Sequence, residues 1–180
     1  MTCSAGAEWK QAYVALGGNL GDVLAAFRSV FRDFVAAEEI RAVRFSSAFK
    51  TVALTVDGYS EDVPAYWNAV CAMETRHSAK QLLSALQRLE LAQGRVRQGR
   101  WEERTLDLDI LSYDNEVVCD SDLSLPHPRL AERNFVLQPF AEIAPDYKIP
   151  QWNKSVGDLL AQQADKWAGI VEKRENWLTR

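Results

Sequence analysis

Two aspartates separated by one residue, Asp107 and Asp109, point most directly to chemistry in this sequence. They alternate with Leu106, Leu108 and Ile110, which is typical of a strand with apolar side chains on one face and acidic ones on the other. Cα atoms two residues apart in a strand are about 6.5–7 Å apart. Carboxylates at this spacing reach hard cations, and two-metal sites hold ions about 3.5–4 Å apart. The strand therefore predicts a cation site, although a solvated strand face would show the same pattern.

Four arginines lie within the ten residues that lead into this strand: Arg95, Arg97, Arg100 and Arg104. Guanidinium groups bind phosphate oxygens in a bidentate manner, and carboxylates bind the Mg²⁺ that accompanies a polyphosphate. The arginines and aspartates together indicate a site for a magnesium-bound nucleotide. The alternative is that the arginines form surface ion pairs with neighbouring glutamates, each worth about 0–1 kcal/mol.

A second polar cluster places His127 between Pro126 and Pro128, followed by Arg129 and Arg133. Two residues four positions apart share one face of a helix, so both arginines would point the same way. A histidine in this setting is a candidate for a phosphate contact. A structural role for the histidine remains open.

The common nucleotide and hydrolase motifs are absent from the sequence. No G-x-x-x-x-G-K-[ST] occurs, which excludes a P-loop enzyme, and no G-x-S-x-G supports acyl transfer. The glycines at 17–21 do not fit G-x-G-x-x-G and are typical of a tight connection between a strand and a helix.

Composition and charge narrow the class of protein further. The formal net charge is −4 and the sequence pI is about 5.3, which disfavours a nucleic-acid partner, including an RNA-binding domain. Two histidines and three scattered cysteines exclude a multi-histidine site and predict no thiolate zinc site. No apolar run spans a bilayer and no leader pattern opens the chain, so we expect a cytoplasmic protein with no membrane partner.

Hydrophobic periodicity predicts the elements that must position these residues. Strands are expected at 11–16, 43–49, 66–75 and 105–113, with a short partner strand at 116–119. Helices are expected from residue 22, from the N-cap Ser78 to Gly94, at 129–143 with an interruption near Pro139, and at 156–167. Residues 52–64 are expected to form a loop.

The order of these elements is β-α-β-β-α-β-α-α, without the regular alternation of a parallel doubly wound sheet. It favours an α+β fold, a ferredoxin-like sandwich with a mixed or antiparallel sheet and helices packed on its faces. At 180 residues with 47% hydrophobic content, we expect a single domain over 1–180. Its core would span 11–150, with a C-terminal helical extension at 151–180.

Taken together, these segments resemble the 6-hydroxymethyl-7,8-dihydropterin pyrophosphokinase family of folate biosynthesis, over about residues 12–150. The resemblance rests on Gly-x-Asn-Leu at 17–20, Phe-Lys-Thr at 49–51 and Tyr-Trp-Asn-Ala at 66–69. It continues through Gly-Arg-Val-Arg at 94–97, Asp-Leu-Asp-Ile-Leu at 107–111 and Leu-Pro-His-Pro-Arg at 125–129. The last two blocks, in this order, are the specific ones.

The resemblance implies transfer of the pyrophosphoryl group of ATP to the hydroxymethyl of the dihydropterin, with release of AMP, by a monomer that uses two Mg²⁺ ions. It implies catalytic roles for Arg95, Arg104, Asp107 and Asp109, the two aspartates being the metal ligands. It implies ATP contacts for Glu90, Arg97, Trp101, Ile110, His127 and Arg133. It implies pterin contacts for Thr51, Val52, Leu54, Tyr66, Asn68 and Phe135, with the amide of Asn68 at the ring edge and Tyr66 and Phe135 on its faces.

The arginine-rich loop departs from the family pattern. Glu102 and Glu103 stand where the family usually has Gly-Pro, and they place two negative charges near the expected triphosphate. This departure motivates an alternative, a diverged paralogue that binds nucleotide or pterin with weak or no catalysis.

Overall fold

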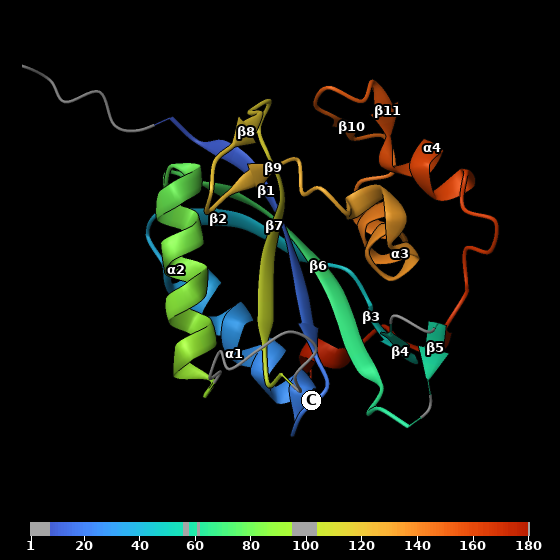
Figure 1. Ribbon diagram of the computed structural model, residues 1–180. Helices are drawn as coiled ribbons and strands as arrows, with labels where there is room; N and C mark the ends of the chain where they lie inside the picture. Colours follow the sequence, from blue (N-terminus) through green and yellow to red (C-terminus); the bar gives the residue numbers. More distant parts are fainter. Residues whose placement is uncertain (1–7, 56–57, 61, 95–103, 180) are drawn as a thin grey trace, which may run out of the picture.

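The computed structural model describes residues 8–55, 58–60, 62–94 and 104–179. Its centre is a six-stranded antiparallel sheet in the order β12-β3-β6-β1-β7, with β2 also pairing with β6 (Figure 1). The strands are β1 (Lys10–Gly18), β2 (Ile40–Phe45), β3 (Ala48–Thr51), β6 (Tyr66–Thr75), β7 (Asp107–Tyr113) and β12 (Ile170–Arg174). The prediction of an α+β fold with an antiparallel sheet is confirmed, and β7-β1-β6-β3 is the strand order of a ferredoxin-like βαββαβ unit.

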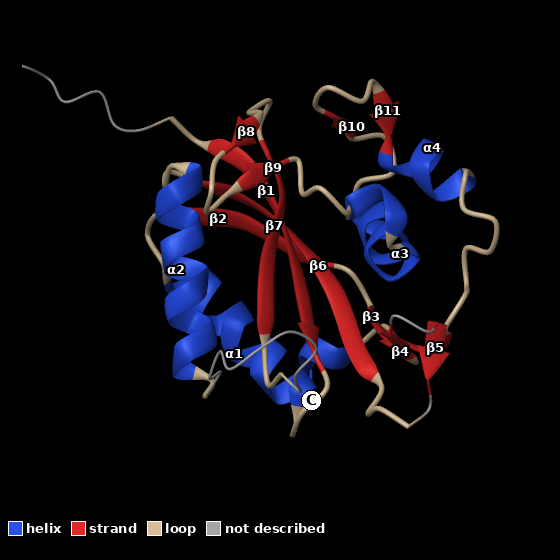
Figure 2. Cartoon of the chain, in the orientation of Figure 1, coloured by secondary structure: helices blue, strands red, loops and turns tan. Residues whose placement is uncertain are grey.

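Helices cover both faces of this sheet (Figure 2). On one face α1 (Val23–Ala36) and α2 (Ala79–Ala92) bury a core with the apolar side chains of β1, β6 and β7. On the other face α3 (Asn134–Ile143) and α4 (Val156–Ala161) bury a second core. The predicted apolar stripe of α1 lies in the first core, where Phe27 and Val30 are fully buried. The apolar side chains of the sheet are used in these two cores. A site would therefore be formed by the polar side chains at one end of the second face.

The ends of α2 follow the predicted signals. Ser78 and Gln81 form a reciprocal capping box at its start, which satisfies two backbone donors of the first turn. Past its end Gly94 takes a φ of 79°, a left-handed conformation that glycine adopts without steric cost. The sequence therefore located this helix correctly.

Three other expectations were wrong. The strand expected at 43–49 is divided between β2 and β3, because Ser46 and Ser47 turn the chain and Ser46 Oγ accepts the Val70 N–H at 2.9 Å. The loop expected at 52–64 contains a hairpin of β4 (Ala53–Thr55) and β5 (Gly58–Ser60). Inside the range expected to pair with the aspartate strand, β8 (Val118–Cys119) instead pairs with β9 (Ser124–Leu125).

The helix expected at 129–143 breaks at a different residue. It consists of the 3-10 turn η1 (Leu130–Glu132) and α3, and the break falls at Arg133, whose φ of −112° and ψ of 98° are extended. Pro139 lies inside α3 instead of interrupting it, and it is buried. This extended residue separates the two helical segments. The prediction of an interruption was therefore right, but its position near Pro139 was wrong.

The helical extension expected at 151–180 was also wrong in its secondary structure. The hairpin of β10 (Lys148–Ile149) and β11 (Lys154–Ser155) precedes α4, which ends at Ala161 and not at residue 167. The chain then forms β12, which pairs with the open edge of β3, and ends in η2 (Trp177–Thr179). A five-residue strand made mostly of charged residues carries little periodicity, and only its pairing with β3 defines it.

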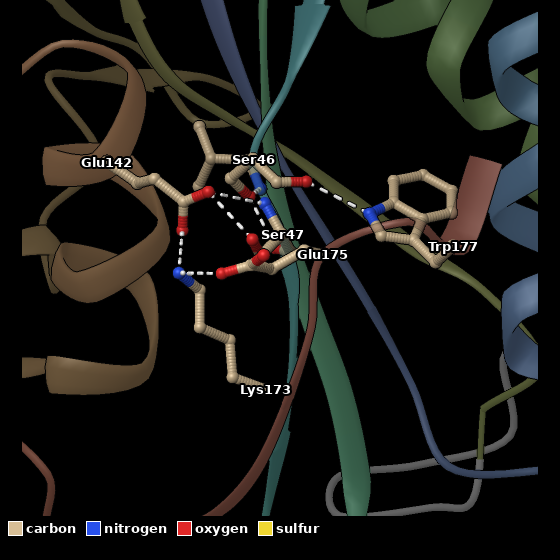
Figure 3. A network of polar contacts seen from close by, with 7 residues as sticks. Ser46, Ser47, Glu142, Lys173, Glu175 and Trp177 are labelled. Atoms are coloured by element: carbon tan, nitrogen blue, oxygen red, sulfur yellow. Dashed lines mark hydrogen bonds and ion pairs between the residues drawn. The ribbon is translucent and has the colours of Figure 1, made fainter. Parts of the chain in front are cut away.

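Polar contacts join this C-terminal part to the rest of the fold (Figure 3). The carboxylate of Glu142 on α3 accepts hydrogen bonds from the backbone N–H and the hydroxyl of Ser47, at 3.1 and 2.7 Å. The same carboxylate pairs with Lys173 of β12 at 3.6 Å. The buried Trp177 donates its Nε1–H to the carbonyl of Ser46 at 2.9 Å. The last strand is thus part of the central sheet, tied to α3 on one face and to the first core on the other.

Candidate active site

The predicted alternation along β7 is present. Leu106, Leu108 and Ile110 are buried in the first core, while Asp107 and Asp109 are half-buried. Because alternate residues of a strand face opposite ways, both aspartates lie on the face that α3 and α4 cover. The strand itself begins at Asp107, two residues later than expected.

The start of β7 is held by the turn that follows β1. The backbone N–H groups of Asn19 and Leu20 both donate to the carbonyl of Arg104, at 2.9 and 3.1 Å. In return the Arg104 N–H donates to Asn19 Oδ1 at 2.8 Å. The guanidinium of Arg104 pairs with the carboxylate of Asp107. The glycine pattern predicted only a tight connection here, and the structure shows that the Asn-Leu pair of this turn holds Arg104 beside the aspartates.

The carboxylate of Asp109 is electrostatically perturbed. Burial raises the pKa of Asp109, and the negative charge of Asp107 raises it further. The positive charges of His127, Arg133 and Arg104 act in the opposite direction on that pKa. These groups therefore lie close enough to interact, so the acidic pair has two guanidinium groups and an imidazole as neighbours.

His127 belongs to the same cluster. Burial lowers the pKa of His127, and Asp109 only partly offsets this effect, so the imidazole is neutral at pH 7. Its backbone N–H donates to the carbonyl of Leu111 on β7 at 2.9 Å, and its Nδ1 accepts the Arg129 N–H at 3.2 Å. The ring is thus attached to the strand that carries the aspartates, with Nε2 as its other polar atom.

The neighbouring strands place an amide in line with Asp107. Gly17 of β1 pairs with Asp107 on one side and with Asn68 of β6 on the other. Directly paired residues of an antiparallel sheet share a face, so the carboxylate and the amide flank a position that has no side chain. A Cβ added at Gly17 would lie 3.7 Å from Asn68 Oδ1 and 3.9 Å from the Cβ of Asp107.

The amide of Asn68 is itself oriented. Its Nδ2 donates to the hydroxyl of Thr51 at 2.9 Å, and both side chains are buried. Thr51 pairs with Tyr66, so the aromatic ring and the Asn–Thr pair lie on the same face of the sheet. Three of the expected pterin residues, Thr51 of β3 and Tyr66 and Asn68 of β6, therefore lie next to one another on one face of the sheet.

Helix α3 supplies the remaining residues on this face. Arg133 directly precedes this helix without a capping hydrogen bond from its side chain, and its guanidinium lies 5.8 Å from the ring centre of Phe135. Phe135 is half-buried and packs partly against the second core. Burial and the charge of Arg129 lower the pKa of Arg133, while Asp109 and Asp107 raise it. This arginine still carries its charge at neutral pH, and it faces the acidic pair from the opposite layer.

Two expected ATP residues have their side chains elsewhere. Ile110 is buried in the first core, on the face of β7 that points away from the aspartates. Glu90 of α2 is 2% exposed and accepts the Leu108 N–H at 2.8 Å, which joins α2 to the edge of β7. Their roles toward ATP stay predictions, and the structure adds a positioning role for Glu90.

The remaining predicted residues belong to the arginine-rich loop and to the segment after β3. Arg95, Arg97 and Trp101, together with Glu102 and Glu103, lie outside the described residues. Val52 is half-buried and donates its N–H to the carbonyl of Gly169 at 2.8 Å, while Leu54 belongs to β4. No sequence signal indicated the contact with Gly169.

The donor set suits magnesium. Within the described part of the chain no group of three or more His, Cys, Asp and Glu side chains gathers into a metal site. Asp107 and Asp109 offer two carboxylates, which is the usual protein contribution to Mg²⁺ when substrate phosphates and water complete the coordination. Gly17 beside them carries no side chain, so only its backbone lies between Asn68 and Asp107 on this face. Among the described helices, none is long and apolar enough to cross a membrane.

Comparison with known proteins agrees with this arrangement. Residues 13–145 match the family described as 7,8-dihydro-6-hydroxymethylpterin-pyrophosphokinase. A protein of Haemophilus influenzae named 2-amino-4-hydroxy-6-hydroxymethyldihydropteridine pyrophosphokinase is 40% identical over 154 residues, 86% of this chain and 93% of its own. A Pseudomonas aeruginosa protein of the same name is 38% identical over 152 residues, 84% of this chain and 91% of its own.

Solved structures show the same fold. Wild-type Plasmodium falciparum HPPK-DHPS superimposes with a TM-score of 0.65 at 11% identity, over 88% of this chain. A second structure of that protein, with the A437G change, gives a TM-score of 0.68 at 11% identity over 88% of this chain. The chain spans less than half of those longer chains, 42% and 46% respectively, so this likeness concerns the fold alone.

Proposed function

Since the chain belongs to the 7,8-dihydro-6-hydroxymethylpterin-pyrophosphokinase family, we propose that it transfers the pyrophosphoryl group of ATP to 6-hydroxymethyl-7,8-dihydropterin and releases AMP. The observation that carries the proposal is the family match over 13–145, which includes both aspartates, His127 and the Asn68–Thr51 pair. The same proposal includes a monomer that works in the cytoplasm.

The acidic pair supports the phosphate half of the reaction. In the proposal Asp107 and Asp109 hold two Mg²⁺ ions, which when bound would neutralise phosphate charge and favour ionisation of the attacking hydroxyl. Arg104, oriented through Asp107, and Arg133 would stabilise the charge on the transferring group. Neutral His127 would donate a hydrogen bond to a phosphate oxygen without adding charge.

The row of residues on β3 and β6 supports binding of the pterin, the acceptor in the proposed reaction. A pterin is flat and has donors and acceptors along its edge, so an oriented amide such as that of Asn68 can recognise it. Tyr66 and Phe135 would contribute aromatic area to its faces. Thr51, Val52 and Leu54 would complete the side of the pocket at the end of β3. The reaction needs positioning and charge more than a protein nucleophile, which fits the residues present.

The test is release of AMP from ATP in the presence of Mg²⁺ and 6-hydroxymethyl-7,8-dihydropterin. We expect the wild-type chain to release AMP only when all three are present, and Asp107→Asn to lower kcat at least about a hundredfold because one charge at the reacting centre is lost. Asp122→Asn, at an exposed aspartate, is the matched control and should keep wild-type rates. No AMP from the wild-type chain at saturating substrates would contradict the proposal.

A further inference from the structure

The segment between α4 and β12 has no role in the reaction as described, and it lies beyond the residues 13–145 that match the family. The end of this segment and the first residue of β12, together residues 166–170 and here called the C-terminal strap, contact α3. Asn134 donates its Nδ2–H to the carbonyl of Ala168 at 2.7 Å. Gln138, one turn further along α3, donates its Nε2–H to the carbonyl of Lys166 at 2.9 Å. Two carboxamides of one helix therefore hold two carbonyls of the strap.

The other side of the strap contacts β3. The carbonyl of Gly169 accepts the Val52 N–H at 2.8 Å, and Ile170 pairs with Thr51 in the sheet. Gly169 takes a φ of 73°, a left-handed conformation with which the chain turns into β12. The strap thus reaches the residues of β3 that the proposed function places against the pterin.

A ring contact adds a third connection. Trp167 is 55% exposed, and its ring centre lies 6.5 Å from that of Phe49. Phe49 is the sheet partner of Asn68, the residue with the oriented amide. The strap therefore touches the row Phe49–Asn68–Gly17–Asp107 at the end opposite the aspartate.

We propose that the C-terminal strap sets the separation between the end of β3 and the start of α3, and that Asn134 is a positioning residue for the pterin. This inference rests on the proposed function, because it takes Thr51, Val52 and Phe135 as pterin contacts. Asn134 lies between Arg133 and Phe135 in the chain, so its buried carboxamide acts directly on the backbone that carries both. Small displacements of positioning residues have large effects on reactivity and binding.

The physical reason for choosing Asn134 is its burial. Its side chain is 6% exposed, so replacing it with alanine removes a buried carboxamide and its hydrogen bond to the carbonyl of the half-buried Ala168. The strap and the start of α3 would then separate or rotate. Phe135 would move with its helix, while the aspartates on β7 would keep their own contacts with β1.

The experiment compares Asn134→Ala with wild type in steady-state kinetics and in calorimetric binding of 6-hydroxymethylpterin with Mg²⁺ and a non-hydrolysable ATP analogue. We expect KM and Kd for the pterin to rise about tenfold, while kcat and KM for ATP change by less than about threefold, because the long side chain of Arg133 can readjust to its phosphate whereas the ring of Phe135 cannot. Asn134→Gln keeps a carboxamide donor and should recover most of the affinity. Gln138→Ala removes the same kind of bond one turn away from Phe135 and should change the pterin KM less than about twofold.

Thermal unfolding of each variant reports whether it is folded at the assay temperature. If Asn134→Ala does not fold, Trp167→Ala replaces it, since that exposed side chain can be removed without emptying a core, and a severalfold rise in pterin Kd is expected. A pterin Kd within twofold of wild type in folded Asn134→Ala, or in Trp167→Ala where that variant replaces it, would overturn the inference. So would an equal loss for both substrates.

The two proposals fail in different ways. Wild-type protein that binds the pterin but releases no AMP contradicts the proposed function, and the Kd of the variants still tests the strap. Wild-type protein that binds no pterin overturns both. Wild-type turnover with an unchanged pterin Kd in Asn134→Ala overturns the strap alone.

Discussion

At the scale of single residues, the charge of Asp109 that would bind a cation also lowers the stability of the fold. The chain buries this carboxylate next to the negative charge of Asp107, and both effects raise its pKa. A folded-state pKa above the unfolded one means that the ionised carboxylate costs free energy of folding at neutral pH. A bound cation would offset this cost, and without one the acidic pair destabilises the fold.

Replacing Asp109 with asparagine should therefore stabilise the protein while it abolishes turnover. In buffer with EDTA at pH 7.5 we expect Asp109→Asn to raise Tm by about 2 °C. The gain should be full above the raised pKa and should disappear as the pH falls toward the ordinary aspartate value of 3.8, because folded wild type then holds the proton as well. Calorimetry at several pH values measures both, and a lower Tm at pH 7.5 would contradict the argument.

At the scale of elements, β1 contributes to the site through a residue without a side chain. Gly17 separates Asn68 from Asp107 across two antiparallel pairings, so the amide and the carboxylate stand two strands apart with an open position between them. Neighbouring strands are about 4.8 Å apart, which places the two residues about 10 Å from each other at their Cα atoms. This spacing lets one substrate group lie between the groups that recognise the ring and those that hold the phosphates.

Gly17→Ala tests whether this open position matters. The added Cβ would make ordinary contacts of 3.7 and 3.9 Å, so we expect the free energy of unfolding to stay within about 0.5 kcal/mol of wild type. The methyl group would occupy the substrate's space, and kcat/KM for the pterin should fall about tenfold or more. Urea unfolding and AMP release measure the two effects. Wild-type kcat/KM in a stable variant would show that substrate does not approach Gly17.

At the scale of the whole molecule, the C-terminal part completes both the sheet and the first core. β12 covers the edge of β3, and Trp177 is 1% exposed, with ring centres 5.7 Å from Phe27 and 5.5 Å from Phe45. Arg28 of α1 also donates to the carbonyl of Trp177 at 3.1 Å. The part of the chain beyond the family match is therefore built into the same fold that holds the site.

Trp177→Ala should consequently destabilise the whole fold. Removing a fully buried indole leaves a cavity and an unpaired carbonyl at Ser46, and we expect a loss of about 3–5 kcal/mol in the free energy of unfolding. Trp167→Ala is the matched control, because that side chain is 55% exposed and its removal should cost less than about 1 kcal/mol. Equal losses in urea unfolding would mean that Trp177 does not belong to the core.

The sequence by itself determined the local features of this protein. The alternation around Asp107 and Asp109, the stripe of α1 and the caps of α2 depend on neighbours within a few residues, so periodicity and capping rules reveal them. The phosphate and pterin residues could be named because two specific motifs carry a family resemblance. Breaks at Ser46 and Arg133 could not be placed, since each depends on hydrogen bonds or packing with distant segments.

Only the tertiary structure decided how these features combine. The row from Phe49 to Asp107 is a matter of register between strands far apart in sequence, and the position of β12 depends on which sheet edge is open. Local sequence does not encode such pairings, because an antiparallel strand accepts many partners and burial of the whole sheet selects one. For the same reason the sequence left residues 168–180 without a role, and the fold brings residues 166–170 against β3 and α3.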